Sequence, residues 1–272
     1  MTGVSRKRMA EVAEVYELAA VPRTADDIVG ELDGAPTKRP KAHDKRVWAS
    51  VEKELPEVIA DAFTEALTRH EGRQRPWVVL VHGDKDQLRA VRAEARRVGV
   101  QPTVVVDVIH VIEYLWKAAW CLHEKADPAA EKWVTERLRR VLEGEVSTVA
   151  AAIRRSATRR GLTEEQRAPI DSCANYLLKY KTMLRYDKYL AAGMPIASGV
   201  IEGACRHLIQ DRLEVTGARW SLDGAEAVLT SRSLRSRGDF DASWTFHLAQ
   251  ELVRNHLKDY AAHELTSLRD AA

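Results

Sequence analysis

Residues 78–110, VVLVHGDKDQLRAVRAEARRVGVQPTVVVDVIH, decide the fold class of this chain. Two apolar runs, at 77–81 and 103–106, have the length and composition of buried strands. Residues 85–98 between them have the spacing of an amphipathic helix, and Gly99 can end that helix in a left-handed conformation. A strand–helix–strand order with entirely apolar strands predicts a parallel strand pair covered by helices, and therefore an α/β fold.

Helical patterns occupy most of the remaining chain, so we predict a small α/β core followed by a large helical part. Residues 8–18 fit either a helix or a strand, because their apolar residues satisfy both periods. An exposed basic linker is expected up to residue 46. The expected helices cover residues 25–32, 45–70 (with a bend near Pro56), 108–123, 133–142, 146–159, 170–190, 199–214, 222–237 and 240–261.

Composition narrows the possible classes of function. The net charge of the 272 residues is only +2, so binding to nucleic acid would have to rely on local basic patches. The three cysteines, Cys121, Cys173 and Cys205, are widely separated, which argues against a disulfide framework or a structural zinc site. The N-terminus lacks the apolar segment of a signal peptide, and no apolar run approaches the roughly 18 residues of a membrane span. We therefore expect a soluble, cytoplasmic protein with no membrane partner.

Polar residues follow both predicted strands at their carboxyl ends. His82, Gly83 and Asp84 follow the first strand, and Asp107 follows the second, with His110 three residues later. Open α/β sheets commonly bind ligands at this edge, so these residues are candidates for chemistry. A structural interpretation also fits, with a glycine turn and with Asp84 and Asp107 capping the next helices.

Glu202 is the third candidate, since it falls in the first turn of the helix expected from residue 199. A catalytic role requires that this carboxylate face the strand ends. Two structural roles are equally open, namely a favourable charge at a helix N-terminus and an ion pair with Arg206.

Arginine residues are concentrated in the C-terminal third of the chain. Arg206, Arg212 and Arg219 lie close to Trp220, and a planar guanidinium suits contact with phosphate. We predict DNA binding at these four residues. The alternative is that they form solvated helix faces paired with nearby carboxylates.

Two long stretches resemble the transposases of the ISKra-type bacterial insertion sequences. These are VVDVIHVIEYLWKAAWCLH (105–123) and residues 194–247, which begin MPIASGVIEGACRHLIQDRL. The segment RKRMAEVAEVYELAAVPRT (6–24) is similar to the part of those enzymes that follows their first catalytic strand. The resemblance implies DNA strand cleavage and transfer at insertion-sequence ends by an RNase H-like core. In that chemistry an Asp-Asp-Glu triad holds two Mg²⁺ ions.

The resemblance also implies roles for individual segments. Residues 6–20 become a strand, and the chain divides into an incomplete RNase H-like α/β core (1–125, with a helical 25–70 segment), a helical insertion (126–195) and C-terminal helices that complete the core (196–272). Glu202 becomes the triad glutamate. Asp107 and His110 match an accessory Asp-x-x-His signature of related transposases.

The chain departs from the family at two triad positions. His82 stands where the family has its second aspartate, and the strand with the first aspartate would precede the segment at 6–24. A neutral imidazole offers one nitrogen lone pair and cannot bridge two Mg²⁺ ions as a carboxylate does. Glu202 and, more weakly, Asp107 remain as candidate metal ligands, so productive Mg²⁺ binding is not expected.

We therefore predict a truncated, catalytically defective transposase that is cytoplasmic and associates with the nucleoid when bound to DNA. Its expected partners are insertion-sequence ends and a second copy of the chain. One alternative is a non-catalytic DNA-binding regulator or partner of a full-length transposase. Another is a small-molecule α/β enzyme that uses the strand ends at 82–86 and 107–110.

Overall fold

The computed structural model describes residues 9–32, 34, 36, 40–69, 75–215 and 217–257. Within these residues the strands form two separate two-stranded sheets. β1 (Glu11–Leu18) pairs antiparallel with β2 (Ala42–Ser50), and β3 (Val78–Val81) pairs parallel with β4 (Thr103–Val106). The predicted parallel pair is thus confirmed, as is the mixed α/β class.

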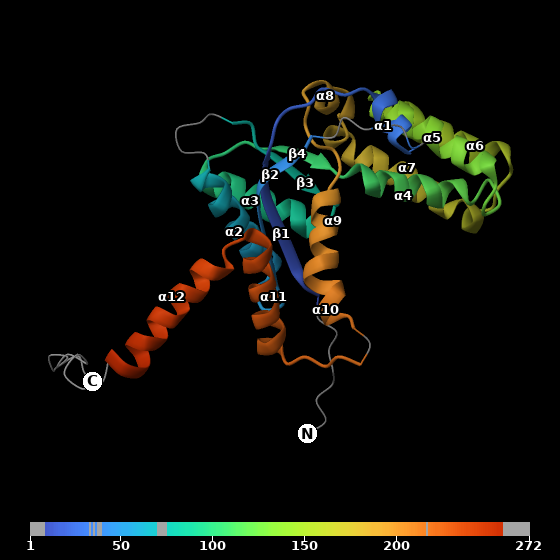
Figure 1. Cartoon of the computed structure of the whole chain (residues 1–272). Coiled ribbons are helices and arrows are strands. Elements are labelled where there is room, and N and C mark those ends of the chain that lie inside the picture. The colour runs from blue at the N-terminus through green and yellow to red at the C-terminus, as the bar shows by residue number, and fades with distance from the viewer. Residues whose placement is uncertain are drawn as a thin grey trace, which may run out of the picture.

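Helices make up most of the described chain (Figure 1). They are α1 (Ala25–Leu32), α2 (Leu55–Thr68), α3 (Lys85–Val98), α4 (Val108–Ala119), α5 (Pro128–Leu142), α6 (Val146–Arg159), α7 (Glu164–Tyr180), α8 (Tyr186–Ala191), α9 (Gly199–Cys205), α10 (Asp211–Leu213), α11 (Leu222–Arg237) and α12 (Phe240–Leu252). A 3₁₀ turn η1 (Lys181–Met183) and the π-helical segments η2 (Arg206–Gln210) and η3 (Val253–Leu257) join or extend them.

Helix α3 shows how local sequence sets an element. At its N-terminus, Oδ1 of Asp84 accepts hydrogen bonds from the amides of Asp86 (2.8 Å) and Gln87 (2.9 Å). These bonds satisfy two amides that have no partner inside the helix. At its C-terminus, Gly99 adopts the left-handed conformation with φ +75° and stops the helix. Both the helix and its glycine end were predicted at these residues.

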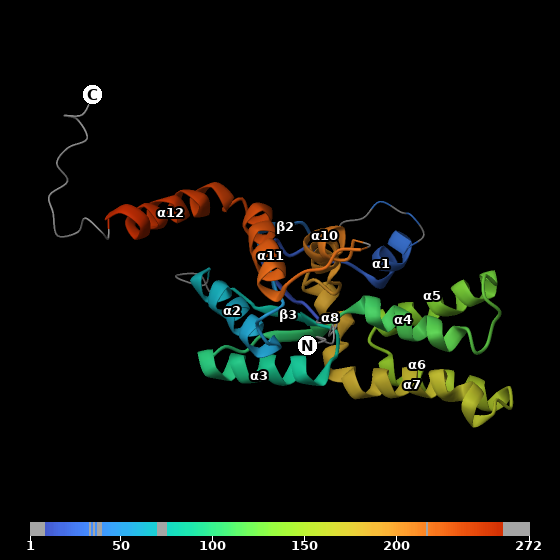
Figure 2. The same ribbon diagram turned by 90° about the horizontal axis from the view of Figure 1, so that it is seen from below.

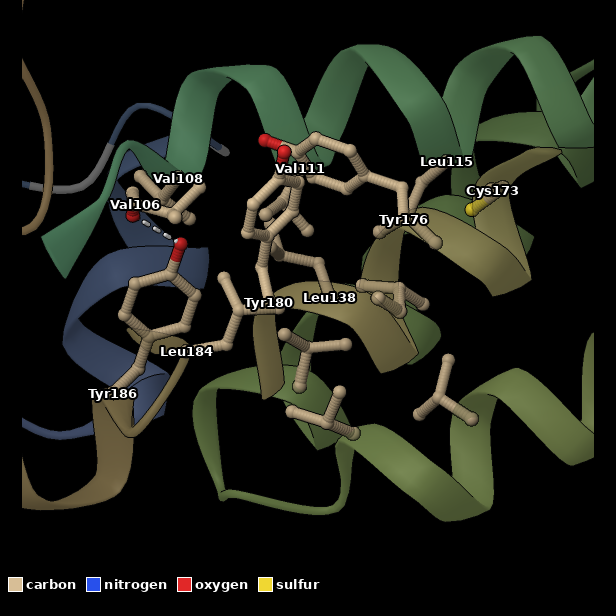
Figure 3. Packing of buried hydrophobic residues seen from close by; sticks show 14 of the residues in the cluster. Val106, Val108, Val111, Leu115, Leu138, Cys173, Tyr176, Tyr180, Leu184 and Tyr186 are labelled. Carbon is tan, nitrogen blue, oxygen red and sulfur yellow. Dashed lines mark hydrogen bonds between the residues drawn. The ribbon is translucent and has the colours of Figure 1, made fainter. Parts of the chain in front are cut away.

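The main hydrophobic core joins the β3–β4 sheet to the bundle formed by α4 to α8. Helix α4 leaves β4 directly and packs against α5 and α7 (Figure 1). Figure 3 shows Tyr186 of α8 reaching this core, where its hydroxyl donates a 2.6 Å hydrogen bond to the carbonyl oxygen of Val106. Tyr186 is completely buried, so this bond fastens the helical bundle to the end of β4.

The segment after β1 also binds the end of the helical bundle. The amide of Val21 donates to the carbonyl of Gly193 (3.3 Å), and the amide of Arg23 donates to that of Leu190 (3.0 Å). Gly193 has φ +71°, and a Cβ atom there would lie 2.5 Å from the backbone nitrogen of Val21. The contact between the two backbones therefore requires glycine at position 193.

A second, smaller core lies on the β1–β2 sheet. Val47, Ala49 and Val51 pack there with Leu208 and Leu229, from η2 and α11. Helices α9 and α11 thus lie against this sheet, whereas α12 extends away from the rest of the chain (Figures 1 and 2). No described side chain of α12 is buried.

One predicted helix is wrong in its first half. Residues 45–50, expected to begin a helix running to residue 70, belong instead to β2, and the helix starts only at Leu55. Val47, Ala49 and Val51 alternate at period two, and this strand period, rather than the helical one, puts them in the second core. The basic residues at 42–46 are therefore part of a strand and not of a linker.

Several boundaries also differ from the prediction. The predicted helix at 170–190 is split into α7, which begins six residues earlier at Glu164, and α8. Thr163 caps α7, and Pro169 lies inside this helix. Helix α4 ends at Ala119 rather than residue 123, and α5 begins at Pro128 rather than residue 133. The strand expected at 6–20 is present as β1. Some predicted residues lie outside the described part of the chain, namely 6–8 of this strand, residue 70 of the helix predicted at 45–70 and 258–261 of the last predicted helix.

Candidate functional site

The carboxyl ends of β3 and β4 bring the predicted site residues together. The two strands are in register, with Val81 opposite Val106, so the residues that follow them lie at the same edge. The amide of Asp107 extends the pairing by donating to the carbonyl of Val81 at 2.9 Å. His82 and Asp107 therefore start from adjacent backbone positions, as expected for parallel strands.

His82 and His110 face each other at this edge. Their ring centroids are 4.5 Å apart, with the ring planes inclined at 56°. Loss of solvation, and then the charge of His110, lowers the pKa of His82, while Asp107, Glu202 and Glu113 act in the opposite direction. The carboxylates at the strand ends are thus close enough to influence His82, yet its imidazole is kept mainly neutral at pH 7.

Two tyrosines of α7 hold the turn at His82 and Gly83. The hydroxyl of Tyr176 donates to the carbonyl of His82 at 3.3 Å, and that of Tyr180 donates to the carbonyl of Gly83. Gly83 has φ +89°, and a Cβ atom there would lie 3.2 Å from the hydroxyl oxygen of Tyr176. The predicted glycine turn is confirmed, and its tyrosine contacts add a reason for glycine that the sequence did not reveal.

Asp107 is used inside the protein. Its side chain is buried, with 1% of the residue exposed. Oδ1 accepts from the amide of Ile109 at 2.8 Å, and Oδ2 accepts from the amide (3.0 Å) and the hydroxyl of Ser198. The helix-capping interpretation of Asp107 is confirmed, and protein donors use three of the roughly four lone-pair sites of this carboxylate.

Glu202 lies in the first turn of α9, whose N-cap is Ser198. The bond from Ser198 to Asp107 brings this helix to the strand ends, and the charge of Glu202 reaches both His82 and Cys205. Glu202 is solvent-exposed. The structure therefore gathers positions 82, 107, 110 and 202 around one edge, although they span 120 residues of sequence.

Glu14 of β1 belongs to the same region and was not predicted. Its Oε2 atom is buried and has no hydrogen-bond partner among the described residues. Burial raises the pKa of Glu14 to about 7, against an opposing effect of Lys45. Burial, followed by the charges of Glu202 and Glu14, raises the pKa of Cys205. Burial, followed by the charges of Glu14 and Asp107, raises the pKa of Tyr16. Period-two alternation with Val12 and Tyr16 was the signal that would have put Glu14 on this face.

These residues do not fit a two-metal centre. In the described part of the chain, no group of three or more histidine, cysteine, aspartate or glutamate side chains could hold a metal ion. His82 contributes no carboxylate, and Asp107 is committed to backbone and serine donors. Glu202 is the one predicted ligand whose carboxylate is exposed, and one carboxylate does not make the oxygen cage that paired Mg²⁺ ions need.

The predicted DNA-binding residues lie on the surface around η2, α10 and the segment before α11. Arg206, Arg212, Arg219 and Trp220 are all exposed. The guanidinium carbon of Arg212 lies 5.6 Å from the centroid of the Trp220 ring. A cation held over an indole face gives this surface, which we call the Arg–Trp surface, both charge and a stacking platform.

Comparisons of the chain with models of known protein families, with curated proteins and with solved structures find no match. Among the described residues, no helix has the length and apolar character needed to cross a membrane.

Proposed function

We propose that this chain is a member of the Asp-Asp-Glu transposase group that binds DNA but no longer cleaves it. The observation that carries the proposal is the pair His82–His110 at the strand ends, with Glu202 close by. Polar residues at the carboxyl ends of the paired strands β3 and β4 support this proposal. An imidazole stands where the transposase resemblance requires a metal-binding carboxylate.

The charges at the carboxyl ends of β3 and β4 support the loss of metal-dependent DNA cleavage. A two-metal centre concentrates several carboxylates, whose mutual repulsion the bound cations relieve. Here protein donors surround both oxygens of Asp107, so its charge is already compensated from within the chain. Its bonds join β4, α4 and α9 and hold the edge together without a cation.

DNA binding is supported by the Arg–Trp surface. Arg212 and Trp220 are exposed and in contact, a combination suited to phosphate and to an unstacked base. Arg212→Gln together with Arg219→Gln should weaken binding of duplex DNA and reduce the slope of log K against log salt by about 2, or about one for each phosphate that is no longer neutralised. Fluorescence anisotropy with a labelled duplex measures both quantities.

The matched control removes two other exposed arginines, Arg155→Gln and Arg159→Gln on α6. This variant has the same change of formal charge, but we expect a smaller change in affinity. An equal loss in both double variants would show a general charge effect and contradict a role for the Arg–Trp surface. If the unmodified chain fails to bind duplex DNA at low salt, the proposed function is wrong.

A second candidate is a regulator that associates with an active transposase rather than acting alone. The observation that favours it is α12, which leaves the body of the chain and exposes Trp244, Phe246 and Leu248. Exposed apolar side chains on one projecting helix are typical of surfaces that bind another protein. Co-purification of the chain with an active transposase, abolished by Phe246→Ser and Leu248→Ser, would support this candidate over the first.

A further inference from the structure

A groove between α3 and the end of α7 is strongly basic. It has a volume of about 410 Å³, and five of its eight lining residues are cations: Lys85, Arg89, Arg92, Arg96 and Lys179. Two apolar side chains, Leu88 and Met183, also line it. None of these residues belongs to the Arg–Trp surface, and none is one of the site residues predicted at the strand ends.

The cations of this groove are poorly neutralised. Arg89 pairs with Asp86 at 2.9 Å, but no carboxylate of the described chain lies within ion-pair distance of Lys85, Arg92 or Arg96. The other carboxylates of this helix are occupied, since Asp84 caps its N-terminus and Glu94 binds Arg97 at 2.5 Å. The groove therefore has a net positive charge that could attract an anion.

The spacing of the cationic side chains along α3 favours binding of an extended anion over a small one. Lys85, Arg89, Arg92 and Arg96 follow one another at intervals of four, three and four residues, which makes one stripe along α3. At 1.5 Å per residue this stripe is about 16 Å long, similar to the axial length of about five phosphates in one DNA strand. A single phosphate would contact one or two of these side chains, so their distribution suits a polyphosphate backbone.

The groove is positively charged, but its lining has no exposed aromatic ring on which a base could stack. Tyr180 is its one aromatic lining residue, and it is buried with its hydroxyl bonded to the carbonyl of Gly83. Stacking on bases needs an exposed ring face, and base-edge recognition needs side chains that enter a groove of the duplex. Binding here should therefore depend on the backbone and not on sequence.

The groove starts beside the strand ends. Lys179 and Tyr180 line it, and the hydroxyl of Tyr180 donates to Gly83, the residue after His82. Figure 2 shows the end of α7 meeting the start of α3 at this point, with α3 continuing beside the β3–β4 sheet. A nucleic-acid strand in the groove would thus pass next to His82.

We propose that the α3–α7 groove binds the phosphodiester backbone of nucleic acid without sequence preference, as a site separate from the Arg–Trp surface. This goes beyond the proposed function, which needs only one DNA-binding surface. The two sites would let the chain contact two segments of nucleic acid, or one long segment along the edge that holds His82.

The test uses a double variant of the full chain, Arg92→Gln with Arg96→Gln. Both side chains are exposed, so the variant should keep the melting temperature of the parent within about 2 °C. Binding of a labelled duplex of arbitrary sequence is measured by anisotropy between about 50 and 200 mM salt. We expect an affinity loss of at least about tenfold at about 100 mM salt and a salt slope smaller by about 2.

Two comparisons make the result specific. The double variant Arg155→Gln and Arg159→Gln should lose much less affinity than the Arg92 and Arg96 variant. A duplex with a scrambled sequence should show the same affinity losses as the original duplex. Duplex DNA, single-stranded DNA and RNA are measured separately, and the groove predicts a loss for each nucleic acid that the parent binds. Vesicles containing phosphatidylserine form the last arm, since a basic stripe also suits an anionic membrane.

Normal DNA binding by the Arg92 and Arg96 variant would overturn the groove proposal while leaving the proposed function intact. Loss of vesicle binding without loss of nucleic-acid binding would also overturn it. A loss that appears only in the Arg212 and Arg219 variant would assign all binding to the Arg–Trp surface. If both double variants lose affinity for DNA, and the quadruple variant shows the sum of the two losses in binding free energy, the result would support two sites.

Discussion

The carboxylate of Asp107 accepts hydrogen bonds from both the amide and the hydroxyl of Ser198, a residue 91 positions later in the chain. Ser198 is itself 5% exposed and starts the helix that presents Glu202. The same carboxylate caps α4 through Ile109. Asp107 therefore holds the end of β4 and two helices in one arrangement, which makes it a structural residue of the site.

Replacing Asp107 by alanine should destabilise the fold strongly. The change removes a helix cap and leaves buried donors of Ser198 without a partner, a combination expected to lower the free energy of unfolding by about 2–4 kcal/mol. Urea denaturation followed by circular dichroism measures the loss. Asp84→Ala, which removes an exposed cap from α3, should cost only about 1 kcal/mol. Equal costs for the two variants would contradict the structural role of Asp107.

Glu14 should make stability depend on pH. Its pKa is raised from 4.5 to about 7 in the folded chain, so the folded state holds this proton more tightly than the unfolded state. The resulting stabilisation is complete below about pH 4.5 and is lost as the pH rises through about 7. Glu14→Gln, which keeps a neutral side chain, should therefore raise the melting temperature at pH 8 more than at pH 4.5.

The exposed Glu52 provides the control for this measurement. Glu52→Gln should change the melting temperature by about the same small amount at both pH values, because its carboxylate is in solvent. A Glu14→Gln variant that behaves like the Glu52→Gln variant would show that burial of Glu14 has no energetic consequence.

His110 should lower the pKa of His82 in a measurable way. Their rings are 4.5 Å apart, and the charge of His110 is the second cause of the lowered pKa of His82, after loss of solvation. In His110→Gln, the pKa of His82 should rise but stay below that of a free histidine. An NMR titration of the ring protons measures it, with His43→Gln as a control that should leave His82 unchanged. No rise in His110→Gln would mean that the two rings do not interact in solution.

Gly83 should be intolerant of a side chain for two separable reasons. The positive φ of +89° costs any other residue about 1–2 kcal/mol, and a Cβ atom would also press on Tyr176 and Tyr180. Gly99 has a similar φ of +75° with open space around it, so Gly99→Ala measures the first cost alone. Gly83→Ala should destabilise the chain more than Gly99→Ala in thermal or urea denaturation. If Gly99→Ala costs as much, the tyrosine contacts contribute nothing.

Local chemistry made part of the fold predictable. Features that depend on neighbouring residues were confirmed. They are the strands β3 and β4, the helix between them, and the capping roles of Asp84 and Asp107. Residues 42–50 were misassigned because Val47 and Val51 fit a helical period, while the strand partner that decides the matter, β1, lies about 30 residues away. Propensity is a weak guide where a distant partner determines burial.

The site was predictable as a set of positions but not as a set of interactions. Parallel strands bring His82 and Asp107 to one edge by geometry alone, which the sequence pattern shows. The second oxygen of Asp107 binds Ser198, and the turn at Gly83 is held by tyrosines of α7. Both contacts join residues far apart in the chain, so no local sequence pattern predicts them. Glu14 was missed because acidic residues recur at every third position of β1, so the strand lacks the apolar–polar alternation that would assign each side chain to one face.

We propose that the chain binds DNA without cutting it, and incubation with supercoiled plasmid in Mg²⁺ or Mn²⁺ distinguishes binding from cleavage. On an agarose gel we expect retarded plasmid that returns to its supercoiled position after protein digestion. His82→Asp should behave in the same way, because Asp107 stays bonded to Ile109 and Ser198 and cannot join Glu202 in a two-metal centre. Metal-dependent nicking by the unmodified chain that disappears in Glu202→Ala would contradict this account.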